Sequence, residues 1–203
     1  GEGSSVPADR VVDEIRSLGG EAVASYDSVA TVEGGKAIVS KAIDTFGRID
    51  ILIHNAGILR NRTLSKMEPD EWAAVQAVHL NAAYNVTRPA FERMRENRFG
   101  RIVVTTSAAG LYGNFGQTNY GAAKLGLVGF MNSLKLEGRK HNITVHSIAP
   151  IALTRMSQVA VTPKFAPAIK PEFVTAMVAW LCSAENSFTT GAVFDLSGGR
   201  ATY

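Results

Sequence analysis

Residues 49–57 read IDILIHNAG, an apolar run of six residues that ends in a turn with a glycine. Such a run is typical of a β-strand that is buried on both faces of a parallel sheet. Two later runs, RIVVTT at 101–106 and ITVHSI at 143–148, are also rich in β-branched residues. The three stretches therefore predict buried strands of one sheet.

Helical patterns alternate with these strands along the chain. The first helix has Pro7 in its first turn and Gly19-Gly20 at its end, which are the residues that begin and end helices. We expect helices at 7–18, 31–46, 69–96, 120–140 and 171–182, and strands at 21–26, 49–54, 101–106, 143–148 and 192–196. Strands that alternate with helices are joined by crossovers, so the sequence predicts one α/β domain over 1–203, with a doubly wound, Rossmann-like parallel sheet.

The composition excludes several classes of protein. Of the 203 residues, 46% are hydrophobic and 19% are charged, as in a globular domain with a sizeable core. No apolar run approaches the roughly 18 residues of a membrane span, and the basic residues behind the net charge of +3 are scattered. We expect no membrane or nucleic-acid partner, a buried and reduced Cys182, and a cytoplasmic location.

Three polar residues follow predicted strands in a pattern that suits proton transfer. Ser107 follows RIVVTT, Tyr120 opens the next helix, and Lys124 lies one helical turn after Tyr120. A cation beside a phenol favours the phenolate, so the pKa of Tyr120 is expected below the usual value of about 10. Such a phenol exchanges protons with an alcohol or carbonyl oxygen, and Ser107 would hydrogen-bond the same oxygen. The Tyr–Lys pair alone would also fit a solvated helix face, and no metal site is expected.

The turn Asn55-Ala56-Gly57 has two interpretations. Gly57 lacks a side chain, so its backbone could approach a flat ligand closely, and Asn55 could fix the turn through its amide. An ordinary tight turn after a strand would have the same residues.

Together, Asn55-Ala56-Gly57, Ser107, Tyr120-Gly-Ala-Ala-Lys124 and Pro150 make the sequence resemble the short-chain dehydrogenase/reductase family from about residue 7 to residue 199. The resemblance implies an NAD- or NADP-dependent oxidoreductase. In it, Tyr120 is the general acid/base, Ser107 positions the substrate oxygen, and Lys124 binds the nicotinamide ribose. The cofactor contacts that the resemblance implies are Asp27, Ser28, Asn55, Ala56, Gly57, Tyr120, Lys124, Pro150 and Thr154.

The resemblance also implies a homodimer or homotetramer built on the helices 69–96 and 120–138. The apolar residues expected to support this association are Tyr84, Val86, Leu127, Phe130 and Leu134.

Stretches such as NAGILRNR (55–62) and LYGNFGQTNY (111–120) are similar to the D-3-hydroxyacyl-CoA dehydrogenase branch of the family, found in multifunctional enzyme 2. This likeness implies a small-molecule substrate of the 3-hydroxyacyl or 3-oxoacyl thioester class, carried by CoA or by acyl carrier protein. Reductases of steroids and of other ketones share much of the pattern, so these substrates stay open.

His79 departs from the usual family pattern. Many members have an asparagine there that holds a water molecule of a proton relay, and Asn81 lies two residues too far along the helix to replace it. A histidine can hydrogen-bond the same water through a ring nitrogen, so His79 is a candidate for the relay. A packing role for a half-buried histidine is the alternative.

The glycine-rich turn with which the family begins has no match in this sequence. We therefore expect that the first strand–helix–strand unit is missing and that the native chain extends upstream. The residue that distinguishes NAD from NADP would lie in that unit. The alternative to an enzyme is a non-catalytic relative that serves as an oligomeric or regulatory subunit.

Overall fold

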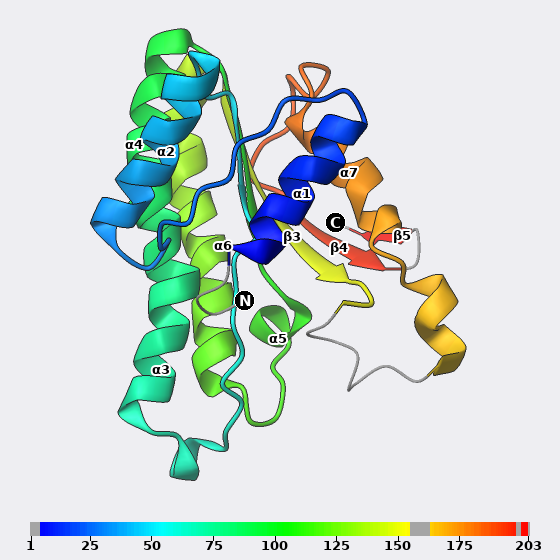
Figure 1. The fold of residues 1–203 in the computed structure, drawn as a ribbon. Coiled ribbons are helices and arrows are strands. Elements are labelled where there is room, and N and C mark those ends of the chain that lie inside the picture. Colours follow the sequence, from blue (N-terminus) through cyan, green and yellow to red (C-terminus); the bar gives the residue numbers. More distant parts are fainter. Residues whose placement is uncertain (1–4, 155–162, 198–199, 203) are drawn as a thin grey trace.

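A five-stranded sheet forms the centre of the computed structural model, which describes residues 5–154, 163–197 and 200–202 (Figure 1). The strand order follows the sequence, from β1 to β5, and the first four strands are parallel while β5 is antiparallel to β4. The strands are β1 (Ile51–His54), β2 (Gly100–Thr105), β3 (Ile143–Ile151), β4 (Val193–Ser197) and β5 (Arg200–Thr202). The expected α/β fold with a mainly parallel sheet is confirmed.

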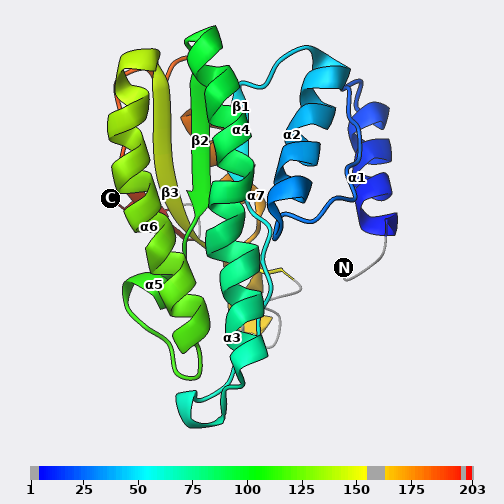
Figure 2. The same cartoon turned by 90° about the vertical axis from the view of Figure 1, so that its left-hand side faces the viewer.

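Helices cover both faces of the sheet (Figures 1 and 2). One face carries α2 (Val32–Phe46), α4 (Ala82–Asn97) and α6 (Thr118–Gly138), and α7 (Glu172–Cys182) covers the other. The helix α1 (Val6–Ser17) lies beyond the β1 edge of the sheet and has no buried residue (Figure 2). This arrangement explains the composition of the central strands, because all six residues of β2 and the first seven of β3 are buried. Residues buried between the sheet and α4 or α6 include Met94, Ile102, Val104, Leu127, Met131 and Val145. Cys182 is a free, buried thiol on α7, as expected.

The predicted long helix at 69–96 has a break in its hydrogen-bond pattern. It begins as α3 (Pro69–Gln76), passes through the π-helical turn η2 (Ala77–Asn81) and continues as α4. Glu68 and Glu71 form a reciprocal capping box that fixes the start of α3. Single π-helical turns often occur at functional sites, and this one carries His79.

The strand predicted at 21–26 is wrong. These residues form no strand, and among the described residues none lies beside them as a pairing partner. A β-strand needs such a partner for its backbone hydrogen bonds.

The expectation that the strand IDILIH is buried on both faces is also wrong. β1 lies at the edge of the sheet, where Ile51 and Ile53 are 46% and 44% exposed. Only the face that carries Leu52 and His54 packs against the helical layer with α2 and α4.

Three of the five residues expected to support association are core residues instead. Val86, Leu127 and Leu134 are buried against the sheet or α2, because the spacing that places them on one helix face also turns that face inward. Tyr84 remains half-exposed, at 50%.

Short elements that the sequence did not predict complete the fold. They are β5, the helix α5 (Ala108–Leu111) and the 3-10 turns η1 (Leu64–Lys66), η3 (Arg139–His141) and η4 (Pro163–Ala168).

Candidate active site

A cleft of about 770 Å³ lies at the carboxyl ends of the parallel strands. This is where ligands bind in open α/β sheets. The cleft brings together the sequence-predicted residues Asn55, Gly57, His79, Ser107, Tyr120, Lys124, Pro150 and Thr154. Its outer wall includes Leu59, Tyr112, Asn114, Gln117 and Ile151.

Ser107 lies between β2 and α5, where the chain changes from strand to helix. Its extended backbone makes it the N-cap of α5, and its hydroxyl accepts a hydrogen bond from the Ala109 N–H at 3.2 Å. The same hydroxyl lines the cleft with Tyr120 and acts to lower the Tyr120 pKa. The local helix start therefore fixes the Ser107 hydroxyl beside the phenol.

Lys124 is held beneath Tyr120 on α6 with only 3% of its surface exposed. Its ammonium donates to the Thr105 carbonyl at the end of β2, 2.5 Å away, and lies 5.4 Å from the centre of the Tyr120 ring. Burial lowers the pKa of Lys124 to about 8, because desolvation disfavours the charged form. Thr106 donates to the Lys124 carbonyl at 2.6 Å and so ties α6 to β2.

The expectation that the pKa of Tyr120 lies below its usual value is wrong for this arrangement. Burial raises that pKa, and the Ser107 hydroxyl opposes this effect without exceeding it. The Lys124 ammonium bonds to the Thr105 carbonyl instead of the phenol oxygen.

His79 is 4% exposed and contacts both the cleft and the chain after β1. Its Nε2 lies 2.9 Å from the Ile58 carbonyl oxygen and 3.1 Å from the Ile58 nitrogen, while Nδ1 has no hydrogen-bond partner in the described chain. The ring meets that of Tyr120 edge to face at 5.1 Å. Burial and the nearby Lys124 charge lower the His79 pKa to about 4, so the ring is neutral at pH 7.

The turn at 55–57 needs its glycine for a reason that the sequence did not indicate. A Cβ on Gly57 would lie 2.6 Å from His79 Cε1, closer than side chains approach one another. Asn55 borders the cleft on one side and a smaller cavity on the other, whereas Ala56 borders only the smaller cavity.

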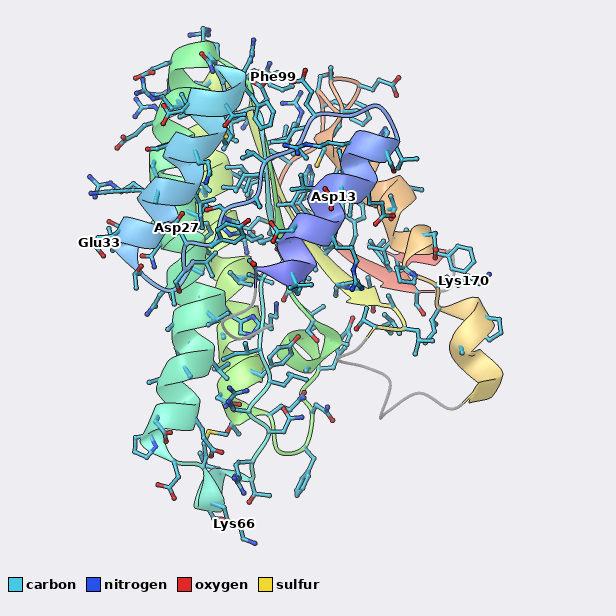
Figure 3. All side chains as sticks on the ribbon, viewed as in Figure 1. Asp13, Asp27, Glu33, Lys66, Phe99 and Lys170 are labelled. Carbon is cyan, nitrogen blue, oxygen red and sulfur yellow. The ribbon has the colours of Figure 1, made fainter. Side chains whose placement is uncertain are left out.

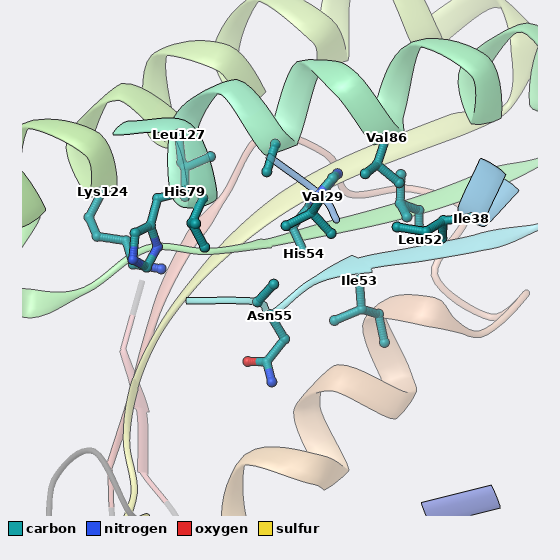
Figure 4. A pocket seen from close by; sticks show the side chains of 13 residues that line it. Val29, Ile38, Leu52, Ile53, His54, Asn55, His79, Val86, Lys124 and Leu127 are labelled. Atoms are coloured by element: carbon teal, nitrogen blue, oxygen red, sulfur yellow. The ribbon is translucent and has the colours of Figure 1, made fainter. Parts of the chain in front are cut away.

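That smaller cavity, of about 130 Å³, lies behind Lys124 between β1 and the helical layer (Figure 4). Its polar side chains are those of His54, Asn55, His79 and Lys124. His54 Nε2 lies 2.7 Å from the Thr87 hydroxyl, and burial with the Lys124 charge lowers the His54 pKa to about 4.

The structure does not bring Asp27 and Ser28 to the cleft. Both are exposed, and Asp27 accepts a hydrogen bond from Ser25 beside the start of α2 (Figure 3). Their contact with a cofactor stays a prediction.

Sequence reasoning missed Asn119, which is fully buried immediately before Tyr120. It also missed Gln117, which hydrogen-bonds both Asn61 and Asn114 in the wall of the cleft. The only available signal was the position of Asn119 next to Tyr120, and an asparagine at the start of a helix usually indicates no more than a cap.

The neutral His54 and His79 predict that the protein loses stability in acid. In the unfolded chain both rings gain protons below pH 6.5, whereas in the folded protein they resist protonation down to about pH 4. Unfolding therefore becomes easier as the pH falls through this window. Each pKa unit corresponds to about 1.4 kcal/mol. Between pH 7 and pH 4.5, the free energy of unfolding of His54→Gln should therefore fall by roughly 2 kcal/mol less than that of wild type. Urea unfolding at both pH values measures this; equal losses in the two proteins would contradict it.

No helix in the described ranges is both long and apolar enough to cross a membrane. Within the same ranges, no group of three or more His, Cys, Asp or Glu side chains is placed to hold a metal ion.

Residues 2–163 match the short chain dehydrogenase family. The chain is 48% identical over 199 residues to the peroxisomal multifunctional enzyme type 2 of the mouse. The matched region is 98% of this chain but only 26% of the mouse protein. It is 35% identical over 201 residues to the acetoacetyl-CoA reductase of Cupriavidus necator, covering 94% of this chain and 82% of that enzyme. A crystal structure of a short chain dehydrogenase from Mycobacterium avium superimposes with a TM-score of 0.88 at 40% identity, covering 96% of this chain and 68% of that one. With the cleft and its Ser107, Tyr120 and Lys124, these likenesses show that the chain belongs to the short chain dehydrogenase family.

Proposed function

We propose that this chain interconverts a secondary alcohol and a ketone with NAD or NADP. The observation that carries the proposal is that Ser107, Tyr120 and Lys124 line one cleft, with the Lys124 ammonium 5.4 Å from the centre of the Tyr120 ring. A non-catalytic subunit would have no need of a buried lysine whose charged form is destabilised. The dinucleotide-binding and catalytic parts would then form one domain over residues 1–203.

The residues of the cleft fit a nicotinamide cofactor. About 770 Å³ is within the range of small-molecule sites, and the cleft lies where open α/β sheets bind dinucleotides. Asn55 and Gly57 would border the cofactor on the β1 side, and Pro150 and Thr154 on the β3 side. When bound, the cofactor supplies or accepts the hydride.

The chain itself would handle the proton. In the reducing direction, the Tyr120 hydroxyl donates its proton to the carbonyl oxygen, and Ser107 donates a hydrogen bond that holds this oxygen in place. The Lys124 ammonium, 5.4 Å from the ring centre, would stabilise the phenolate that remains. In the oxidising direction, the phenolate takes the proton from the alcohol.

His79 would hold a water molecule that relays protons to this site. The cavity behind Lys124 is large enough for water, and His79 Nδ1 is a buried polar atom without another partner in the described chain. A water molecule there could hydrogen-bond Lys124 and His79 Nδ1 together.

The substrate would be a 3-hydroxyacyl or 3-oxoacyl thioester of CoA or acyl carrier protein. The name of the Cupriavidus necator relative supports this class, and the cleft wall offers the apolar side chains of Leu59, Tyr112 and Ile151 to an acyl group. The mouse relative's name makes the peroxisome the alternative to the expected cytoplasmic location.

A homodimer or homotetramer on α4 and α6 remains our proposal for the assembly. Tyr84 on α4 is 50% exposed, and Leu125 and Leu136 on α6 are 50% and 69% exposed.

The test of this function is oxidation of NADH or NADPH by the full chain with acetoacetyl-CoA, compared with a steroid ketone. We expect cofactor oxidation that depends on the thioester. If the cofactor is oxidised only with the steroid ketone, the substrate is a steroid and not an acyl thioester. Tight cofactor binding without turnover on any ketone would support the non-catalytic alternative.

A further inference from the structure

Asn119 links Tyr120 to two elements outside α6, namely α3 and the segment 58–62. It is 0% exposed, and its side chain makes three hydrogen bonds. The amide nitrogen donates to the Arg60 carbonyl at 2.9 Å and to the Glu71 carbonyl at 3.3 Å. The amide oxygen accepts from the backbone N–H of Tyr120 at 2.8 Å.

The third of these bonds holds the backbone of Tyr120 itself. Tyr120 is the third residue of α6, so its N–H has no carbonyl partner one turn earlier in the helix. Asn119 satisfies this N–H while its amide nitrogen is fixed by two carbonyls outside α6. The start of α6 is therefore attached to α3 and to the segment 58–62, and cannot shift without breaking buried hydrogen bonds.

The segment 58–62 also follows the turn that would border the cofactor. His79 holds its first residue, Ile58, and the Gly116 carbonyl accepts from the Arg62 N–H at 2.8 Å. Gln76 on α3 donates to the Asn119 carbonyl at 2.9 Å. Asn119 thus lies where the start of α6, α3 and the segment after β1 meet.

We propose that Asn119 is a positioning residue that holds Tyr120 in place in the cleft beside Ser107 and Lys124. This inference rests on the proposed function for its importance to turnover, but the geometry can be tested without turnover. A displacement of about 1 Å at a reacting group can cost roughly 100-fold in rate, so a shift of the Tyr120 hydroxyl would lower turnover strongly.

The experiment measures how strongly Ser107 affects the phenol. The pKa of Tyr120 is followed by near-ultraviolet difference absorbance, with Tyr120→Phe as the blank. The Ser107 hydroxyl acts to lower this pKa, so Ser107→Ala should raise it in the wild-type background. In the Asn119→Leu background, Ser107→Ala should leave the pKa unchanged, because Tyr120 is no longer held beside Ser107.

Asn186→Leu is the matched control. Asn186 is also 0% exposed and makes three side-chain hydrogen bonds, but its partners are His146, Leu181 and Thr189, which do not line the cleft. Ser107→Ala should raise the Tyr120 pKa there as in wild type. In turnover, Asn119→Leu should lose roughly 100-fold in kcat with KM nearly unchanged, while Asn186→Leu at equal stability stays near wild type.

Three results would overturn the proposal. One is a rise in the Tyr120 pKa with Ser107→Ala that is as large in Asn119→Leu as in wild type. Another is the absence of any rise in wild type, since there would then be no contact to maintain. If Asn119→Leu does not fold, Asn119→Ser replaces it; if neither folds while Asn186→Leu does, the role is structural only. Unchanged turnover in Tyr120→Phe would instead sink the proposed function and leave the pKa result standing.

Discussion

Replacing Tyr120 with phenylalanine is expected to lower turnover at least about 100-fold. General acid/base groups contribute roughly 10²- to 10⁴-fold, and phenylalanine removes the hydroxyl while keeping the ring. The ring packs edge to face against His79, so the variant should fold and bind cofactor nearly as wild type does. Steady-state reduction of acetoacetyl-CoA, with cofactor affinity from fluorescence titration, measures both effects.

Ser107 provides the comparison for this variant. Ser107→Ala leaves the phenol in place and removes only the hydroxyl that would hold the substrate oxygen, so its loss of turnover should be smaller. Retention of more than half of the wild-type turnover by Tyr120→Phe would end its assignment as the general acid/base.

Lys124→Met is expected to have the second largest effect, also about 100-fold in kcat, and to change the pH profile. The Lys124 pKa of about 8 means that its charge is present below that pH and lost above it. If the charge stabilises the phenolate, wild-type activity should change through a break near pH 8 that belongs to the Lys124–Tyr120 pair. The Met variant should lack this break. The same break in both proteins would show that another group titrates.

The stability of Lys124→Met separates this loss from misfolding. The pKa of Lys124 is lower in the folded than in the unfolded protein, so below pH 10.5 burying it costs stability. Methionine has similar length and no charge, and it gives up only the hydrogen bond to Thr105. The Tm of the variant at pH 7, measured by thermal unfolding, should therefore equal or exceed that of wild type.

The parts of the fold that the sequence predicted are those where local pattern and burial agree. The runs RIVVTT and ITVHSI are buried on both faces and form β2 and β3. The helices expected at 7–18 and 31–46 are α1 and α2, whose ends differ from these bounds by at most one residue. In the two strands the residue types that favour the secondary structure are also the apolar ones that pack in the core.

The errors arise where the outcome depends on distant neighbours. Residues 21–26 have the composition of a strand, but a strand forms only beside a partner. Ile51 and Ile53 are apolar, yet their face of β1 is exposed because β1 is an edge strand. The direction of the Tyr120 pKa shift depends on burial, which the spacing of Tyr120 and Lys124 does not reveal.

The candidate site was predictable in its reacting groups and not in their support. Spacing placed Tyr120 and Lys124 on one helix face, and Ser107 at the end of a strand beside them. Asn119 was missed because its partners, the Arg60 and Glu71 carbonyls, are backbone atoms far away in sequence. Any residue has a backbone carbonyl, so such partners cannot be recognised from the sequence.

The most direct test of the account is the stoichiometry of a single reaction. The full chain is incubated with acetoacetyl-CoA and either NADH or NADPH, and both the reduced cofactor consumed and the 3-hydroxybutyryl-CoA formed are measured, for wild type and Tyr120→Phe. The account predicts equal amounts of the two for wild type and almost none for the variant. Product formed without cofactor consumption, or equal rates in the two proteins, would contradict it.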